Sequence, residues 1–192
     1  MKQHVIVFCL MAWWWAGAEA QTEFNAKIGI SAWSLRDEKE LVDVSRHPGQ
    51  FVGFDVMIEK NRKIFSPGFH YHRISVMNED HAFSLEVSPS HHMHFFTIPL
   101  TGGYKVLDAS AMSISLLAGG EINFFYSLDD NDAGLDDDMF YGISTGLTGI
   151  VHTEFLTFVT LEMRYHYTLQ PIIKIRDDSK LRGLTIGLGA KF

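Results

Sequence analysis

The last eleven residues indicate the fold class: Arg182-Gly183-Leu184-Thr185-Ile186-Gly187-Leu188-Gly189-Ala190-Lys191-Phe192. Apolar residues stand at every second position from 184 to 192, and threonine, glycine and lysine alternate with them. Because successive side chains of a β-strand point to opposite faces, the pattern predicts a strand with one apolar face and one small or polar face. This strand ends on an aromatic residue, Phe192.

The beginning of the chain has the pattern of a secretory signal peptide. Met1-Lys2 is positively charged, residues 5–15 form an apolar run, and Ala18-Glu19-Ala20 is a small-x-small cleavage site before Gln21. The alternative is a membrane-spanning helix, but the run is well short of the ~20 residues that a span needs. We therefore predict that residues 1–20 are a cleaved signal peptide and that residues 21–192 form one domain.

Composition limits what the mature chain can be. Cys9 is the single cysteine, and it lies inside the predicted signal peptide but not at a lipoprotein-type cleavage site, so no lipid anchor, disulfide or thiol chemistry is expected. A net charge of −7 gives no electrostatic support for a nucleic-acid partner. The mature chain has no apolar run long enough to span a bilayer as a helix. If it is integral to a membrane, it must be a closed barrel, since only helices and closed barrels satisfy all backbone groups in lipid.

Alternation recurs in eight segments, an even number that is typical of single-chain bacterial barrels. The predicted strands are Phe24–Trp33, Gln50–Lys60, Ile64–Val76, Met93–Lys105, Ser110–Tyr126, Met139–Gly149, Glu154–Thr168 and Leu181–Phe192. Long and short connections alternate between them. The long ones are Ser34–Gly49, Met77–His92, Ser127–Asp138 and Leu169–Lys180, and the short ones are Asn61–Lys63, Val106–Ala109 and Ile150–Thr153.

The alternation of long and short connections predicts an eight-stranded antiparallel up-and-down transmembrane β-barrel, with both termini in the periplasm and the long loops outside the cell. A soluble lipocalin-like barrel also has eight antiparallel strands, but its interior is apolar and its exterior polar. The predicted seventh strand sets Leu161 and Met163 against Glu162 and Arg164. Charges facing lipid near the midplane would cost ~2–4 kcal/mol each, so we expect the charged face to line the lumen.

Aromatic residues gather near the predicted strand ends. Such residues typically form two girdles at the membrane interfaces. The residues expected to form them are Trp33, Phe95, Phe96, Tyr104, Phe125, Tyr126, Tyr165, Tyr167 and Phe192.

Several short motifs occur in a familiar order. They are Ser66-Pro67 with Tyr71, Phe95-Phe96-Thr97-Ile98-Pro99-Leu100, Leu161-Glu162-Met163-Arg164-Tyr165-His166-Tyr167-Thr168-Leu169, and Gly187-Leu188-Gly189-Ala190-Lys191-Phe192. In these four motifs and their order, the mature chain resembles the small outer-membrane β-barrel domain family of Bacteroidota, which includes the PorT-like proteins. Thr97 and Gly68 stand where that family has acidic residues, so lumenal charge partners are expected to differ. PorT is linked to type IX secretion, but most family members have no assigned task, and that role is not carried over.

The resemblance also implies a role for the last residue. In outer-membrane barrels a terminal aromatic is part of the signal that the barrel-assembly machinery reads. Phe192 is therefore the expected assembly signal of this chain.

Charged residues on the predicted lumenal faces are expected to neutralise one another as a structural plug, because unpaired buried charge is costly. This predicted set is Asp55, Glu59, Lys105, Glu121, Glu162, Arg164 and Lys191. The alternative is a polar conduit or a small ligand site, for which eight strands leave little room.

Histidines and aspartates suggest alternative metal sites. Of ten histidines, His70 and His72 share a strand face, while His91, His94 and His81 would need the second long loop to fold back to converge on a metal. The third long loop carries six aspartates but lacks the EF-hand order; it offers loose Ca²⁺ binding or bridging to lipopolysaccharide, against a simply solvated loop. A cluster of one residue type is only compositional, so no metal site and no cofactor is predicted.

An enzyme is a further alternative, because some outer-membrane barrels modify lipids. His72, Ser75 and Glu86, or His94 with Ser90, could be drawn as catalytic sets. No phosphate-cradling glycine loop, zinc-protease helix motif or nucleophile elbow is present.

The sequence thus predicts an integral outer-membrane protein of a Gram-negative bacterium with a structural or accessory, non-enzymatic role. The expected partners are outer-membrane lipid and lipopolysaccharide, the assembly machinery during biogenesis, and an envelope protein met through the long loops. The alternatives are a narrow porin or small-solute or cation-binding barrel, and a lipid-modifying enzyme.

Overall fold

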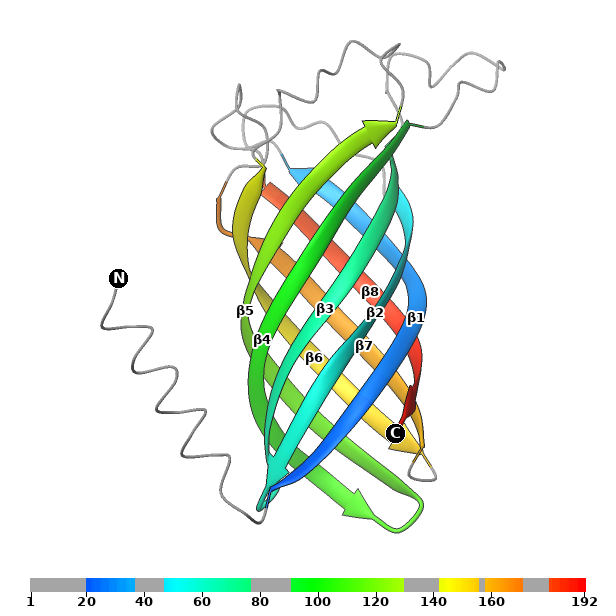
Figure 1. Ribbon diagram of the computed structural model, residues 1–192, viewed down its shortest axis with the longest axis vertical. Helices are drawn as coiled ribbons and strands as arrows, with labels where there is room; N and C mark the ends of the chain where they lie inside the picture. The colour runs from blue at the N-terminus through cyan, green and yellow to red at the C-terminus, as the bar shows by residue number, and fades with distance from the viewer. Residues whose placement is uncertain (1–19, 37–46, 77–90, 130–141, 156–157, 171–179) are drawn as a thin grey trace, which may run out of the picture.

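A computed structural model shows a closed barrel of eight antiparallel β-strands, in which each strand pairs with the next and β8 pairs with β1 (Figure 1). The strands are β1 (Gln21–Arg36), β2 (His47–Lys60), β3 (Lys63–Val76), β4 (His91–Ala109), β5 (Met112–Asp129), β6 (Ile143–Phe155), β7 (Val159–Thr168) and β8 (Lys180–Lys191). The structure describes residues 20–36, 47–76, 91–129, 142–155, 158–170 and 180–192. No helix in these segments is long and apolar enough to cross a membrane. The predicted fold class is confirmed, and the predicted signal peptide lies outside the described residues except for Ala20.

The two ends of the barrel differ in their connections. Strand β1 begins and β8 ends at the same end as the β2–β3 turn, which we call the turn end; we call the opposite end the loop end (Figure 1). The β2–β3 turn has two residues, Asn61 with φ 51° and Arg62 with φ 65°. Positive φ at both central residues defines a type I′ turn, whose twist matches that of the strands it joins. The predicted connection Asn61–Lys63 is confirmed in its position but is one residue shorter, because Lys63 already belongs to β3.

Two other short connections were predicted at the wrong place. Strand β4 runs to Ala109 through a register shift between Lys105 and Leu107, so the turn lies at residues 110–111 and not at Val106–Ala109. Strand β6 runs to Phe155, and its connection to β7 follows that residue, not Ile150–Thr153. In both cases backbone pairing with the neighbouring strand continues through the residues that were expected to turn.

The inside of the barrel is polar and the outside is apolar. On β7, buried and exposed residues alternate along most of the strand. Asp55 and Arg164 are each 2% exposed, whereas the outward side chains of Ile28 and Leu188 are 67% and 60% exposed. A soluble lipocalin-like barrel has the opposite arrangement. The prediction of a polar lumen and an apolar exterior is therefore confirmed, and the lipocalin-like alternative does not fit.

The seam between β1 and β8 closes at the last residue. The N–H of Phe192 donates to the carbonyl of Phe24 at 2.8 Å, and the N–H of Phe24 donates back at 3.1 Å. Along the lumenal face of β8, Gly183 lies under the Trp33 ring, and a Cβ built on Gly187 would lie 2.6 Å from Cζ of Phe51. Two large rings therefore fit against β8 because two glycines leave room for them.

Apolar side chains in the lumen form two clusters. One consists of Met57, Ile64, Leu117 and Ile150. The other lies toward the loop end and consists of Trp33, Ile74, Met93, Phe95 and Leu181, with Phe125 packed against it. Trp33 and Phe95 are 2% and 0% exposed, so the prediction that they belong to the interfacial girdles is wrong: they fill the lumen.

Candidate functional site

Four charged side chains and a histidine meet in the lumen and form what we call the ionic cluster: Lys27, Asp55, His70, Glu162 and Arg164. Lys27 Nζ pairs with Asp55 and lies 2.6 Å from Oε2 of Glu162. Arg164 Nη2 lies 2.9 Å from Oε1 of Glu162 and 3.3 Å from Oδ2 of Asp55. Each of the four charged side chains is 5% exposed or less. Two cations thus balance two carboxylates, which removes most of the penalty of burying them.

The hydrogen bonds of His70 fix its role in the cluster. Arg164 Nη1 lies 3.1 Å from Nδ1 of His70, and Nε2 of His70 lies 3.1 Å from Oδ1 of Asp55. A guanidinium can only donate, so Nδ1 must accept and the ring proton must be on Nε2, where it donates to the carboxylate. A neutral His70 therefore links Arg164 to Asp55 without changing the net charge of the cluster.

The predicted charge network is divided in the structure. Asp55, Glu162 and Arg164 converge in the ionic cluster, as described above. Glu121 is apart from them and accepts from Nδ1 of His166 at 2.8 Å. The remaining predicted members, Glu59, Lys105 and Lys191, lie nearer the turn end.

Two separate ion-paired groups hold those last members. Lys105 Nζ lies 2.6 Å from Oε2 of Glu59, with side-chain exposures of 14% and 19%. Lys191 Nζ lies 3.0 Å from Oε1 of Glu23 and also pairs with Glu154. Six of the seven thus have an oppositely charged partner, within separate groups and with additional residues, whereas Glu121 is hydrogen-bonded to a histidine.

The key missed residue is Lys27, which supplies one of the two cations. Its signal is visible in Phe24-Asn25-Ala26-Lys27-Ile28, where Lys27 alternates with apolar residues and shares the face of Asn25. His152 is a second missed neighbour, with Nδ1 3.6 Å from Oε2 of Glu162. The prediction that His70 and His72 share a strand face is confirmed; the shared face is the lumenal one, where they are 1% and 0% exposed.

On the loop-end side of the ionic cluster, five rings pack together in what we call the aromatic cluster: Trp33, Phe51, His72, Phe95 and His166. The His72 ring stacks on that of Phe95, with centroids 4.7 Å apart and planes 8° apart, and lies 5.6 Å from the ring of Phe51. The Trp33 ring meets His72 edge-on at 5.4 Å and lies 4.9 Å from His166. Neither ring nitrogen of His72 has a hydrogen-bond partner in the described part of the chain, so ring packing holds this side chain in place.

The alternative metal and enzyme sites are only partly described. Within the described segments, no group of three or more His, Cys, Asp or Glu side chains is placed to hold a metal ion. His94 lies on the outward face, with Nδ1 2.5 Å from the Tyr71 hydroxyl. The other members of those predicted sets lie outside the described residues. They are the side chains of His91 and Ser75, residues 81, 86 and 90, and the aspartates 130–138.

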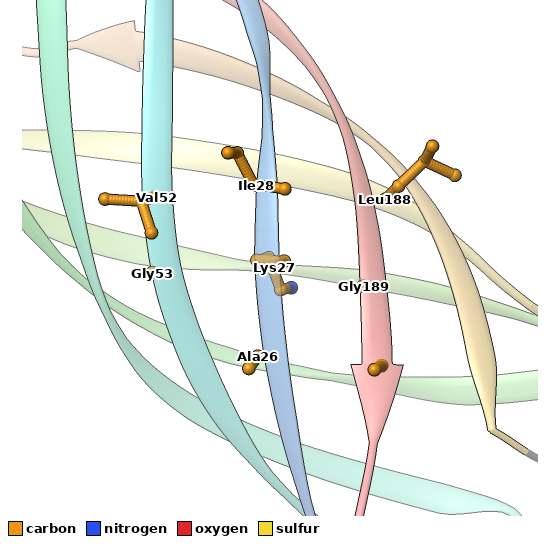
Figure 2. A pocket seen from close by; sticks show the side chains of 8 residues that line it. Ala26, Lys27, Ile28, Val52, Gly53, Leu188 and Gly189 are labelled. Carbon is orange, nitrogen blue, oxygen red and sulfur yellow. The ribbon is translucent and has the colours of Figure 1, made fainter.

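A shallow depression of about 420 Å³ lies on the outward face over β1, β2 and β8. Figure 2 shows Ile28, Val52 and Leu188 around it, with Lys27 on the far side of the β1 ribbon. Because Lys27 is paired inside the lumen, the depression presents aliphatic side chains and no charge.

Comparison with known proteins gives likenesses of fold. The attachment invasion locus protein Ail of Yersinia pestis is 13% identical, with a TM-score of 0.51 over 90% of this chain and 99% of that one. Neisserial surface protein A is 17% identical, with a TM-score of 0.56 over 88% of this chain and 97% of that one. No protein-family model and no curated protein matches the sequence. The chain thus shares with these two proteins the architecture of a closed, eight-stranded antiparallel barrel.

Proposed function

We propose that the protein is an integral outer-membrane barrel with a structural or accessory, non-enzymatic role, its lumen closed by the ionic cluster and its long loops serving as the interaction surface. In this proposal the turn end and both termini face the periplasm, and the loop end faces the exterior. The apolar outward face and the grouping of the long connections at one end support this placement.

The ionic cluster is the observation that carries the proposal. It joins residues of β1, β2, β3 and β7 across the lumen, and its two cations and two carboxylates are balanced. The lumen of eight strands is just wide enough for side chains to fill. A solute would have to separate buried ion pairs in order to pass, which favours a closed barrel over the narrow porin.

Two experiments test the proposal in sequence. Outer-membrane fractions are run on gels with and without boiling; a heat-dependent shift in mobility is expected, because a closed barrel resists unfolding in detergent. Recovery as a soluble periplasmic protein without that shift would overturn the membrane assignment.

The purified barrel is then reconstituted in planar bilayers. Wild type is expected to show no steady conductance, whereas R164A, which removes one of the two cations that contact both carboxylates, is expected to conduct. R73A serves as the control, because Arg73 is exposed on the outward face. A conducting wild type would favour the porin alternative.

The non-enzymatic part of the proposal is tested by lipid analysis. The mass spectrum of lipid A and phospholipids from cells that overproduce the protein is expected to match that of cells without it. A mass shift would favour the lipid-modifying alternative. The resemblance to the Bacteroidota family stays a prediction, as do the assembly machinery and an envelope protein as partners.

A further inference from the structure

A second surface lies on the outward face at the loop end of β8. The side chains of Lys180, Arg182, Leu184, Ile186 and Leu188 share this face. The three apolar ones are 40%, 44% and 60% exposed in that order. Along a single strand, the face therefore changes from aliphatic to cationic where it approaches the loop end, as expected at the boundary between hydrocarbon and headgroups.

Arg182 contacts an aromatic ring and has no anionic partner in the described part of the chain. Its Cζ lies 5.2 Å from the centroid of the Tyr167 ring, and its Nε is buried without a hydrogen-bond partner in the described part of the chain. Within the same segments, no carboxylate forms an ion pair with Arg182 or with Lys180. Stacking on an aromatic ring orients a guanidinium while leaving its other donors free for an anion.

A groove leads away from this guanidinium. It has a volume of about 350 Å³ and is lined by Ala32, Trp33, Ser34, Tyr165, Arg182, Gly183 and Leu184. Residues of β1 and β7 form its sides, because Arg182 pairs with Ser34 on one side and with Tyr167 on the other. The groove is mainly apolar, and Arg182 is the charged residue among those that line it.

We propose that this surface binds one membrane lipid, whose phosphate is held by Arg182 and Lys180 and whose acyl chain lies in the groove beside Leu184. A guanidinium can bind two oxygens of one phosphate. Residues two apart in a strand lie on the order of 7 Å from one another, so the Lys180 ammonium is within reach of the same headgroup. The site rests on the proposed membrane location and adds to it a particular ligand class, a membrane lipid that carries a phosphate group.

The test uses the mature barrel folded in detergent and measures binding by native mass spectrometry. Three probes separate the sources of affinity: dioleoyl phosphatidic acid carries phosphate and chains, dioleoylglycerol carries only the chains, and inorganic phosphate carries only the anion. Phosphatidic acid is expected to bind. Dioleoylglycerol is expected to bind at least about tenfold more weakly, since a hydrogen bond to a charged group contributes about 1.5–3 kcal/mol, or tenfold and more. Millimolar phosphate is expected to leave the lipid complex intact.

Variants locate the site. R182Q is expected to weaken phosphatidic acid binding about tenfold, and K180Q less, whereas R73Q, which removes an exposed outward cation from β3, is expected to leave it within about twofold. A32F narrows the groove and is expected to lower lipid binding too. Equal binding by all variants, equal binding of dioleoylglycerol, or displacement by phosphate alone would overturn the proposal. Each variant is first checked for the heat-dependent mobility shift; loss of that shift in wild type would instead overturn the proposed function.

Discussion

The ionic cluster and the aromatic cluster lie next to each other in the same lumen and are stabilised in different ways. On β3, His70 belongs to the first cluster and His72, two residues on, to the second. Both ring nitrogens of His70 have partners, whereas those of His72 have none in the described part of the chain. Strand alternation places both residues inside; the residues at the same level on neighbouring strands decide whether a histidine takes part in hydrogen bonding or in ring packing.

The largest expected effect comes from removing a charge from the ionic cluster. In R164M, Asp55 and Glu162 are left with one cation, Lys27. Breaking a buried ion pair from one side costs about 3–5 kcal/mol, and that loss is expected in urea unfolding of the barrel in phospholipid vesicles. The exposed Arg73 provides the control, since R73M is expected to change the unfolding free energy by less than about 0.5 kcal/mol. A loss of less than about 1 kcal/mol in R164M would show that its partners are not held as paired charges.

Removing both members of one pair is expected to cost less than the two single changes together. K27M and E162M each leave an unbalanced charge in the lumen, whereas the double variant leaves Arg164 opposite Asp55. A double-mutant cycle on the unfolding free energy is expected to give a coupling on the order of 2 kcal/mol. Additive effects would mean that Lys27 and Glu162 are stabilised separately.

The two histidines provide the most direct comparison of the clusters. H70F removes hydrogen bonds to Asp55 and Arg164, and the expected loss of stability is about 1–2 kcal/mol. H72F replaces a ring that already stacks between phenylalanines, and it is expected to leave stability unchanged or to raise it by up to about 1 kcal/mol, because the described residues form no hydrogen bond with the His72 ring. Equal losses in the same vesicle assay would mean that the two sites do not differ.

The smallest effect is expected at the turn end. Lys105 and Glu59 are more exposed than the ionic cluster, and K105Q is expected to cost less than about 1 kcal/mol. That cost should shrink further in 1 M salt, because salt screens exposed charges more than buried ones. Unfolding of wild type and K105Q at low and high salt checks this; a salt-independent loss of several kcal/mol would place the pair with the buried cluster.

The sequence predicts which face each charged residue occupies but not which charges meet. Asp55, Glu162 and Arg164 all fall on lumenal faces by simple alternation. Their convergence with Lys27 depends on the stagger between neighbouring strands, such as the pairing of Lys27 with Gly53 on β2 and with Gly189 on β8. In a closed barrel this stagger is a property of the whole sheet, so no single segment encodes it.

The misplaced turns and girdle residues have a related cause. Gly149, just before Ile150–Thr153, is a residue type that often ends a strand. In the structure His152 and Glu154 nevertheless pair with residues of β5 and continue the strand. Trp33 has the composition of an interfacial aromatic, but Gly183 of β8 leaves room for it in the lumen. Both outcomes depend on a partner strand, whereas local composition describes one strand at a time.

The glycines of β8 have a consequence for how the barrel closes. Gly183 and Gly187 leave room for Trp33 and Phe51, and between and beyond them the lumenal face of β8 carries Thr185 and Leu181. A slip of one residue would turn the lumenal face of β8 outward, and a slip of two would drive the Trp33 ring against a side chain. The two glycines therefore help to set the register between the first and last strands, because these shifted alignments do not fit the rings of the lumen.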